Sequence, residues 1–318
     1  MSPLQGLFSA ISAVILFLYG LQGFSRELQA VGGTALQTWL ARVTASRWRG
    51  FLVGALATAV VQSSSATTAL AVTLVDAAVI PFRASLGVLL GANVGTTATA
   101  WLVSFKLTGI GPVFIVLGAV LSILPVRAKV IGKAVCYFGL VFFALDLIST
   151  ELKPLQNSAQ LKDWLALAEA PLMGVLAGAV FTALVQSSSV TTGLAILLVQ
   201  QGVLPPEAAI PIVIGSNVGS TSTALIAGLG MRPVARATAI ANFLFNAAGV
   251  LVYLPFLRSF SRAAADLTAN PGMAVAWAHL IFNLTVALIF LLTLNWIEPP
   301  LRSWLGADVK SGGLGSVP

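Results

Sequence analysis

A seven-residue polar stretch at 62–68, with the sequence QSSSATT, lies in the middle of an apolar segment that runs from about residue 50 to residue 80. The stretch returns as QSSSVTT at 186–192, in the middle of a second apolar segment at 171–204, and six of the seven positions are identical. Polar groups that face hydrocarbon without hydrogen-bond partners are costly to bury. Both stretches must therefore face protein, water or a ligand, and the repetition favours a site.

The rest of the sequence places these stretches in a membrane protein. Of the 318 residues, 58% are hydrophobic and 8% are charged, whereas soluble domains carry about 25% charged residues. The apolar runs reach the roughly 20 residues that a membrane-spanning helix needs, and alternating strand patterns are absent. The sequence therefore predicts an all-α integral membrane protein surrounded by the lipid bilayer.

The net charge of +7 does not indicate a nucleic-acid partner, because the basic residues lie between apolar runs, as at Arg42, Arg47 and Arg49. Cys136 is the only cysteine, so the sequence predicts no disulfide framework and no transition-metal site. The apolar run at 7–25 has no basic region before it and no clear cleavage site after it, and we expect a retained span.

The expected membrane segments fall into two kinds. Ordinary spans are predicted at 7–25, 84–105, 110–125, 131–149, 208–228, 236–257 and 274–297. The segments 50–80 and 171–204 are longer and polar at their centres. Two more polar stretches, 25–48 and 150–169, are expected to lie along the membrane interface.

The chain carries an internal duplication. Gln62 and Gln186, Pro81 and Pro205, and Asn93 and Asn217 are all separated by 124 residues, and about half of the residues from 54 to 100 recur at this offset. A weaker similarity relates YGL at 19–21 to FGL at 138–140.

The polar-centred segments favour a hairpin over a crossing. A straight helix of about 30 residues would reach about 45 Å, whereas the hydrocarbon core is about 30 Å thick. Two half-helices that meet near Ser64 would instead form a re-entrant hairpin. Three crossings per copy then make the second copy inverted. The expected organisation is repeat 1 at 1–126, repeat 2 at 127–257, an additional transmembrane helix at 258–297 and a short polar tail at 298–318.

A second glycine-containing motif follows each hairpin, GANVGTT at 91–97 and GSNVGST at 215–221. Glycine at this spacing is expected to break the helix, although close helix contacts are an alternative. Broken helix ends offer N–H groups to an anion and carbonyl groups to a small hard cation. No charged residue is expected in either polar centre, so bound cations would have to supply the charge that holds an anion. Such dependence is what a symporter needs.

These paired motifs resemble the sodium-dependent inorganic phosphate cotransporter family, the type II transporters and their bacterial relatives, over about residues 7–297. The segments NFLFN at 242–246 and HLIFN at 279–283 are similar to a family pattern of His, two residues and Phe-Asn, with Asn242 in place of the histidine. The resemblance implies sodium-coupled phosphate symport by alternating access, with Na⁺ as the coupling ion and no other cofactor, in the cell membrane.

Carried over by position, the resemblance implies a phosphate site at Gln62, Ser63, Ser64, Ser65, Gln186, Ser187, Ser188 and Ser189. The expected sodium-binding residues are Gln62, Thr67, Thr68, Asn93, Thr96, Thr97, Gln186, Thr191, Thr192, Asn217, Ser220 and Thr221.

Other functions remain as alternatives. Neutral hydrogen-bond donors do not discriminate between tetrahedral anions, so sulfate or another oxyanion is an alternative cargo. A non-transporting membrane sensor or scaffold is a second alternative function. A serine hydrolase is disfavoured, because the single His279 cannot serve two serine motifs; we expect no enzyme. His279 is expected to hold a structural hydrogen bond. The sequence does not indicate the oligomeric state.

Overall fold

The computed structural model describes residues 3–41, 46–105, 109–124, 127–152 and 170–306. Helices and short connections make up this part of the chain, which confirms the prediction of an all-α protein. In order, the helices are α1 (Pro3–Ala41), α2 (Arg47–Val61), α3 (Ser64–Asp76), α4 (Phe82–Ser104), α5 (Gly111–Ile123), α6 (Arg127–Leu152), α8 (Pro171–Val185), α9 (Ser188–Gln200), α10 (Pro206–Ser220), α11 (Ser222–Gly228), α12 (Pro233–Tyr253), the 3₁₀ turn η3 (Leu254–Phe256), α13 (Leu257–Asp266) and α14 (Pro271–Trp304).

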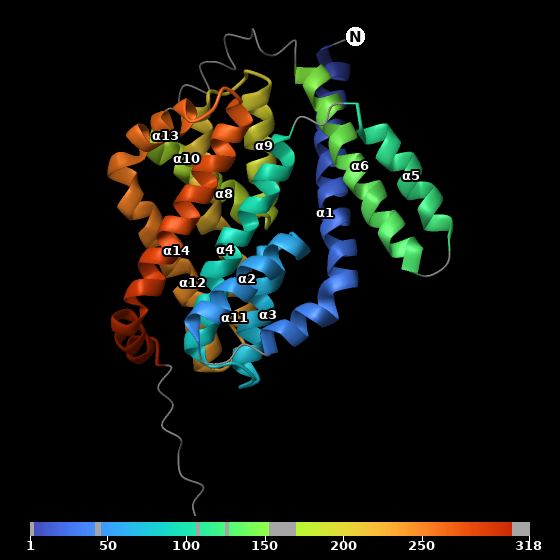
Figure 1. Cartoon of the computed structure of the whole chain (residues 1–318). Helices are drawn as coiled ribbons and strands as arrows, with labels where there is room; N and C mark the ends of the chain where they lie inside the picture. Colours follow the sequence, from blue (N-terminus) through green and yellow to red (C-terminus); the bar gives the residue numbers. More distant parts are fainter. Residues whose placement is uncertain (1–2, 42–45, 106–108, 125–126, 153–169, 307–318) are drawn as a thin grey trace, which may run out of the picture.

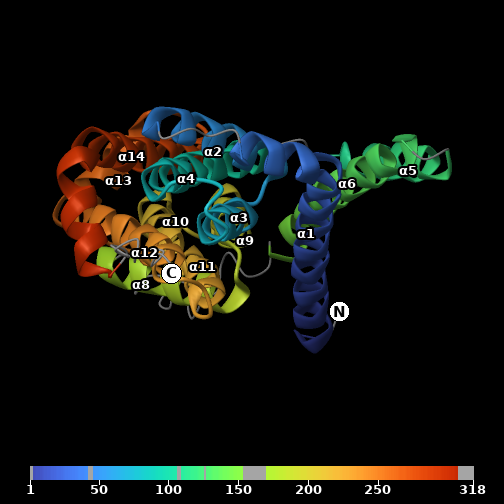
Figure 2. The ribbon, with the colours of Figure 1, turned by 90° about the horizontal axis from the view of Figure 1, so that it is seen from below.

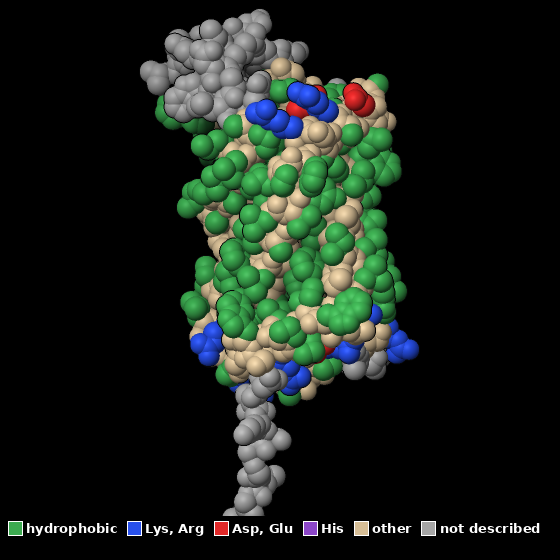
Figure 3. Space-filling model, turned by 90° about the vertical axis from the view of Figure 1, so that its left-hand side faces the viewer, with side chains coloured by type: hydrophobic (Ala, Val, Ile, Leu, Met, Phe, Trp, Pro, Cys, Tyr) green, Lys and Arg blue, Asp and Glu red, His purple; other side chains and the backbone are tan. Residues whose placement is uncertain are grey.

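Five stretches of helix within the described residues are long and apolar enough to cross a bilayer: Phe82–Ser104, Lys129–Thr150, Pro206–Gly228, Pro233–Asp266 and Pro271–Trp304. On the face shown in Figure 3, charged side chains gather at the two ends of the molecule, and hydrophobic side chains are spread over the band between them. This distribution suits a protein that exposes its middle to lipid and its ends to water. The chain is a multi-pass membrane protein.

Several expectations about the segments need correction, stay predictions or fall outside the described residues. The helix at 110–125 is α5, whose 13 residues reach only about 20 Å, so it is shorter than the predicted span. The expected interfacial stretch after residue 25 belongs to α1, which continues to Ala41 and changes direction in its second half (Figure 1), so its interfacial position stays a prediction. Most of the stretch 150–169 lies outside the described residues. The tail 298–318 is described only as far as residue 306.

The chain reverses direction at the first polar stretch. Helix α2 packs side by side with α4, and the backbones approach at Arg47 and Gly87, at Phe51 and Gly91, and at Ala55 and Gly95. Because the residue numbers rise together, α2 and α4 are parallel. Helix α3 connects the far end of α2 to the near end of α4, so it must run back along them. Helices α2 and α3 thus form a helical hairpin with its tip at residues 62–63.

The second polar stretch has the same geometry. Helices α8 and α10 are also parallel, with Val175 against Gly215 and Ala179 against Gly219, and α9, which connects them, runs back along them. Figure 1 places α2 and α3 in one half of the molecule and α8 and α9 in the other. The two hairpins therefore approach the middle of the molecule from opposite ends.

The glycines of the second motif serve close helix packing. A Cβ on Gly91 would fall on the carbonyl oxygen of Phe51, and one on Gly215 would fall on that of Val175. Helix α4 runs unbroken through 91–97, so the predicted broken helix is wrong for the first copy. In the second copy the interruption lies at Thr221, between α10 and α11, just beyond the glycines. The alternative of close contacts accounts for the glycines better.

Helices α1, α5 and α6 form a unit beside the remaining helices (Figures 1 and 2). Glycines again allow close packing, with Gly20 of α1 against Val141 of α6 and Gly111 of α5 against Phe143. The unit contacts the rest of the molecule largely through α1, whose buried Phe17 lies against Gly193 of α9. Within this unit, α1 therefore lies between α5 and α6 on one side and the two hairpins on the other.

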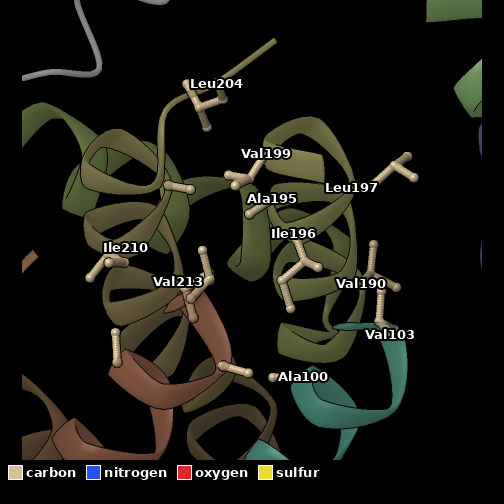
Figure 4. Packing of buried hydrophobic residues seen from close by; sticks show 14 of the residues in the cluster. Ala100, Val103, Val190, Ala195, Ile196, Leu197, Val199, Leu204, Ile210 and Val213 are labelled. Carbon is tan, nitrogen blue, oxygen red and sulfur yellow. The ribbon is translucent and has the colours of Figure 1, made fainter. Parts of the chain in front are cut away.

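The second hairpin is anchored in the largest apolar core. Buried side chains of α9 such as Val190 and Ile196 belong to one cluster with Val213 of α10 and Ala100 of α4 (Figure 4). Within the bilayer these side chains stabilise the fold by close van der Waals packing, because lipid tails are as apolar as the side chains themselves. The core thus fixes α9 against both α10 and the C-terminal half of α4.

Candidate functional site

Both triple-serine motifs line one cavity of about 360 Å³. Its lining residues are Leu21, Gln22, Ser25, Arg26, Gln29, Gln62, Ser63, Ser64, Ser65, Val185, Gln186, Ser187, Ser188 and Ser189. All eight residues expected at the phosphate site are therefore brought together. The wall opposite the two hairpin tips comes from α1.

The two glutamines shape the hairpin tips in the same way. Gln62 and Gln186 end α2 and α8 with left-handed backbone conformations, at φ values of 56° and 59°. A side chain with a Cβ adopts this conformation only at a cost, and such strain is typical of functional positions. The residue that follows each glutamine is extended, at φ −147° in Ser63 and −149° in Ser187, so the chain turns back.

A matching pair of hydrogen bonds orients the two glutamine side chains. Thr99 donates to Gln62 Oε1 at 2.8 Å, and Thr223 donates to Gln186 Oε1 at 2.7 Å. Each Nε2 donates to a backbone carbonyl of the preceding helical turn, that of Ala59 or Ala183. Gln186 Nε2 also contacts the hydroxyl of Ser222 at 3.0 Å. The two copies thus position their amides alike.

Sequence reasoning missed Thr99 and Thr223, although these threonines are themselves related by the offset of 124 residues. Thr99 also links the copies, because its hydroxyl lies 3.3 Å from the hydroxyl of Ser189 at the tip of the other hairpin. The repeat extends through residue 100, and comparing the copies to that point would have identified the pair.

Helix ends give the cavity its electrostatic character. The N-termini of α3 and α9 begin at Ser64 and Ser188, which line the cavity. In the first hairpin Ser63 Oγ accepts a hydrogen bond from the N–H of Ala66, whereas the N-terminus of α9 has no such side-chain cap. Uncapped N–H groups and the helix dipole favour an anion. The C-termini of α2 and α8 lie beside them and carry the opposite partial charge.

The expectation of a site without fixed charge is wrong. Arg26 of α1 lines the cavity together with the two motifs. From its sequence position, Arg26 is expected in the interfacial stretch at 25–48, outside the site. A signal was present in the spacing of Gln22, Ser25, Arg26 and Gln29, which puts four polar side chains on one face of the helix as it leaves the apolar span.

Most of the expected sodium-binding residues lie outside the lining of this cavity. Only Gln62 and Gln186 line the cavity. Several of the other hydroxyls bond to their own helix backbone, as Thr96 does to the carbonyl of Ala92 and Ser220 to that of Asn217. Thr192 differs, since its buried hydroxyl has no hydrogen-bond partner. The described residues also contain no group of three or more His, Cys, Asp or Glu side chains that could hold a metal ion.

Buried asparagines connect α4 and α10, the helices that follow the two hairpins, to α12 and α14. Asn93 of α4 donates to Asn246 of α12 at 3.2 Å. In the second copy Asn217 of α10 lies 3.4 Å from the ring Nε2 of His279 of α14. All four side chains are nearly fully buried. His279 therefore makes a hydrogen bond between helices, in line with its expected structural role.

Comparison with known proteins agrees with this architecture. The family described as Na+/Pi-cotransporter matches residues 16–150 and 148–269, and each stretch contains one copy of the motif. No solved structure matches the chain.

Several curated proteins are similar to this chain. The uncharacterized protein YqeW of Bacillus subtilis is 30% identical over 90% of this chain and 94% of its own length. The putative inorganic phosphate export protein YjbB of Escherichia coli is 30% identical over 93% of this chain, which spans about half (54%) of YjbB. The mouse sodium-dependent phosphate transport protein 2C is 36% identical over 37% of this chain and 20% of its own length. With both halves matched by the family and nearly its whole length shared with YqeW, the chain belongs to the Na+/Pi-cotransporter family.

Proposed function

We propose that this protein is a secondary active transporter that moves inorganic phosphate together with Na⁺ across the cell membrane. One observation carries the proposal: the two copies of the triple-serine motif meet at a single cavity of about 360 Å³. A cavity of this size holds a small polyatomic ion with some water. The names of the relatives, which include sodium-dependent phosphate transport and phosphate export, support the same cargo.

Phosphate would be held by hydroxyls and backbone N–H groups at the hairpin tips. The six serines of the two motifs supply donors without a net charge, and the uncapped N-terminus of α9 adds a positive dipole end. Near neutral pH part of the phosphate carries two negative charges, more than these groups and the single charge of Arg26 offset. Bound Na⁺ would supply the remainder, since two unit charges 4 Å apart attract by about 4 kcal/mol at an effective dielectric of 20.

Sodium would bind close to the anion, where oxygen ligands are available. The C-terminal carbonyls of α2 and α8 and the amide oxygens of Gln62 and Gln186 lie at the tips. The free hydroxyl of Thr192 is a further oxygen ligand one turn into α9. Other expected sodium residues, such as Thr96 and Ser220, donate their hydroxyl hydrogen to the helix backbone and keep oxygen lone pairs that could bind a cation. Oxygen ligands of this kind suit a small hard cation.

We further propose that the two hairpins are re-entrant and that the copies have inverted topology. The parallel packing of α2 with α4 and of α8 with α10 supports the return of each hairpin to its side of entry. The approach of the hairpins from opposite ends supports the inversion. Polar tips at mid-membrane then face each other and the cavity, which spares them contact with lipid.

Transport would proceed by alternating access, in which the hairpins and the helices that follow them move against the remaining spans. Inverted repeats allow this, because exchanging the conformations of the two copies converts a state open to one side into a state open to the other.

The proposed function is tested by uptake of labelled phosphate into proteoliposomes. We expect an inward sodium gradient to drive uptake, and replacement of sodium by potassium or choline to reduce it to background. Unlabelled sulfate tests the rival cargo: stronger inhibition by sulfate than by phosphate would assign another oxyanion. Sodium-linked phosphate binding without any flux would indicate a sensor and contradict transport.

A further inference from the structure

Arg26 is a cation in the wall of the cavity that makes no ion pair with another described residue. Its side chain is exposed and lines the cavity with the two triple-serine motifs. No hydrogen bond or ion pair joins it to another residue in the described part of the chain. The neighbouring acid, Glu27, is mostly buried and lies 3.8 Å from Lys133 of α6. Glu27 is therefore engaged elsewhere and leaves the charge of Arg26 uncompensated.

The position of Arg26 is fixed relative to the first hairpin tip. The adjacent Ser25 donates to the carbonyl oxygens of Val61 and Gln62, at 3.3 and 3.4 Å, and accepts a hydrogen bond from Gln29 at 3.0 Å. These two carbonyls belong to the C-terminus of α2. Helix α1 is thus held in register against the tip, and its charged residue lies beside the serines.

Only one of the two copies supplies such a charge. When YGL at 19–21 is aligned with the weakly similar FGL at 138–140, Arg26 corresponds to Leu145 of α6. Leu145 is buried in the apolar core. No described residue of α6 lines the cavity. The hairpin tips are closely matched in the two copies, whereas the charge on the cavity wall is not.

We propose that Arg26 binds the transported oxyanion directly and determines the charge selectivity of the cavity. A guanidinium group presents planar paired donors that match the oxygens of phosphate, and it keeps its charge at every physiological pH. Arg26 gives the cavity a weak affinity for the anion before sodium binds, and sodium then raises that affinity. This role rests on the proposed function, since it concerns the same site.

The test measures binding of inorganic phosphate to the purified protein in choline and in sodium buffer. Arg26→Gln should weaken binding about ten- to a hundredfold in choline, the range expected for a lost hydrogen bond to a charged group. Sodium should restore part of the affinity. Arg26→Lys should retain most of it, and the matched control Arg258→Gln, which removes an exposed arginine of α13, should bind like the wild type.

A chemical rescue separates charge from folding. In a Cys136→Ser background, Arg26→Cys is modified with a cationic or an anionic methanethiosulfonate reagent of similar size. Phosphate binding should recover with the cationic adduct only.

Wild-type affinity in Arg26→Gln, or equal recovery with both reagents, would overturn the role of Arg26. If the wild-type protein bound neither phosphate nor another oxyanion in either buffer, the proposed function itself would fall, and this role with it.

Discussion

Gln62 and Gln186 adopt the same left-handed conformation and make the same hydrogen bonds, although 124 residues separate them. Neither glutamine is needed to cover the core. Backbone strain at both positions, where glycine would fit at less cost, supports our proposal that the amide side chains serve binding.

Replacing either glutamine by glycine should separate function from stability. In Gln62→Gly and Gln186→Gly the backbone strain is relieved while the amide is lost, so we expect near-wild-type melting temperatures and phosphate uptake at background. Gln200→Ala, which changes a glutamine of α9 bonded to the end of α4, should keep transport. Uptake retained in either glycine variant would remove that glutamine from the site.

The threonines that orient these amides give a milder prediction. Thr99→Val and Thr223→Val remove one hydrogen bond each, worth about 1 kcal/mol, so phosphate affinity should fall about fivefold. Thr99→Ser and Thr223→Ser keep the hydroxyl and should bind almost normally. An unchanged affinity in both valine variants would show that the amides hold their orientation without these bonds.

At this scale the sequence predicted the cavity residues well and the surrounding residues poorly. The duplicated motif was enough to bring Gln62 and the serines to one place, because polar groups repeated at mid-segment must converge away from lipid. Arg26 was missed because it belongs to a helix far from the motif in sequence. The sodium ligands stay a prediction: Thr96, for example, lies outside the cavity lining and donates its hydroxyl hydrogen to the carbonyl of Ala92.

Among the elements, the pairs α2 with α4 and α8 with α10 determine how the hairpins fold back. Their glycines bring the two backbones into contact, and this contact fixes the parallel direction from which the return of α3 and α9 follows. From the sequence alone, a helix break at Gly91 was the favoured prediction and a close helix contact was the alternative. The position of the neighbouring helix distinguishes the two interpretations of Gly91. A glycine that faces no other helix weakens its own helix, whereas a glycine at a helix contact allows close packing.

Gly91→Ala tests this packing. The added methyl group would meet the carbonyl oxygen of Phe51, so α2 and α4 must separate, and overpacking of this kind costs roughly 1–3 kcal/mol. The melting temperature in detergent should fall by several degrees. Gly230→Ala, at a glycine whose Cβ would meet no atom within 4 Å, should change it little. Equal melting temperatures for both variants would contradict the close contact.

The sidedness of the hairpin ends tests the inverted topology. Val79 and Val203 occupy matching turns after α3 and α9. In a Cys136→Ser background, single cysteines at these positions should react with an impermeant thiol reagent from opposite sides of the membrane. Trp48→Cys, at the start of the first hairpin, should be labelled from the same side as Val79→Cys. Labelling of both turns from one side would contradict the inversion.

For the whole molecule, the composition and the apolar runs were sufficient to predict an all-α membrane protein, because lipid leaves a chain few ways to satisfy its backbone. The arrangement of α1, α5 and α6 as a separate unit was not predicted, since its close contacts join helices that carry no polar motif. That unit nevertheless places Arg26 in the cavity wall. The cavity is thus lined by parts of the chain that sequence patterns treat separately.

The central claim is that the two triple-serine motifs form one site in which phosphate and sodium bind together. It is tested most directly by titrating purified protein with phosphate by calorimetry at constant ionic strength, with sodium or with choline. We predict one phosphate per chain and an affinity about 5- to 150-fold higher in sodium, the usual range of coupling between two ligands. Two independent phosphate sites, or the same affinity in both buffers, would contradict the account.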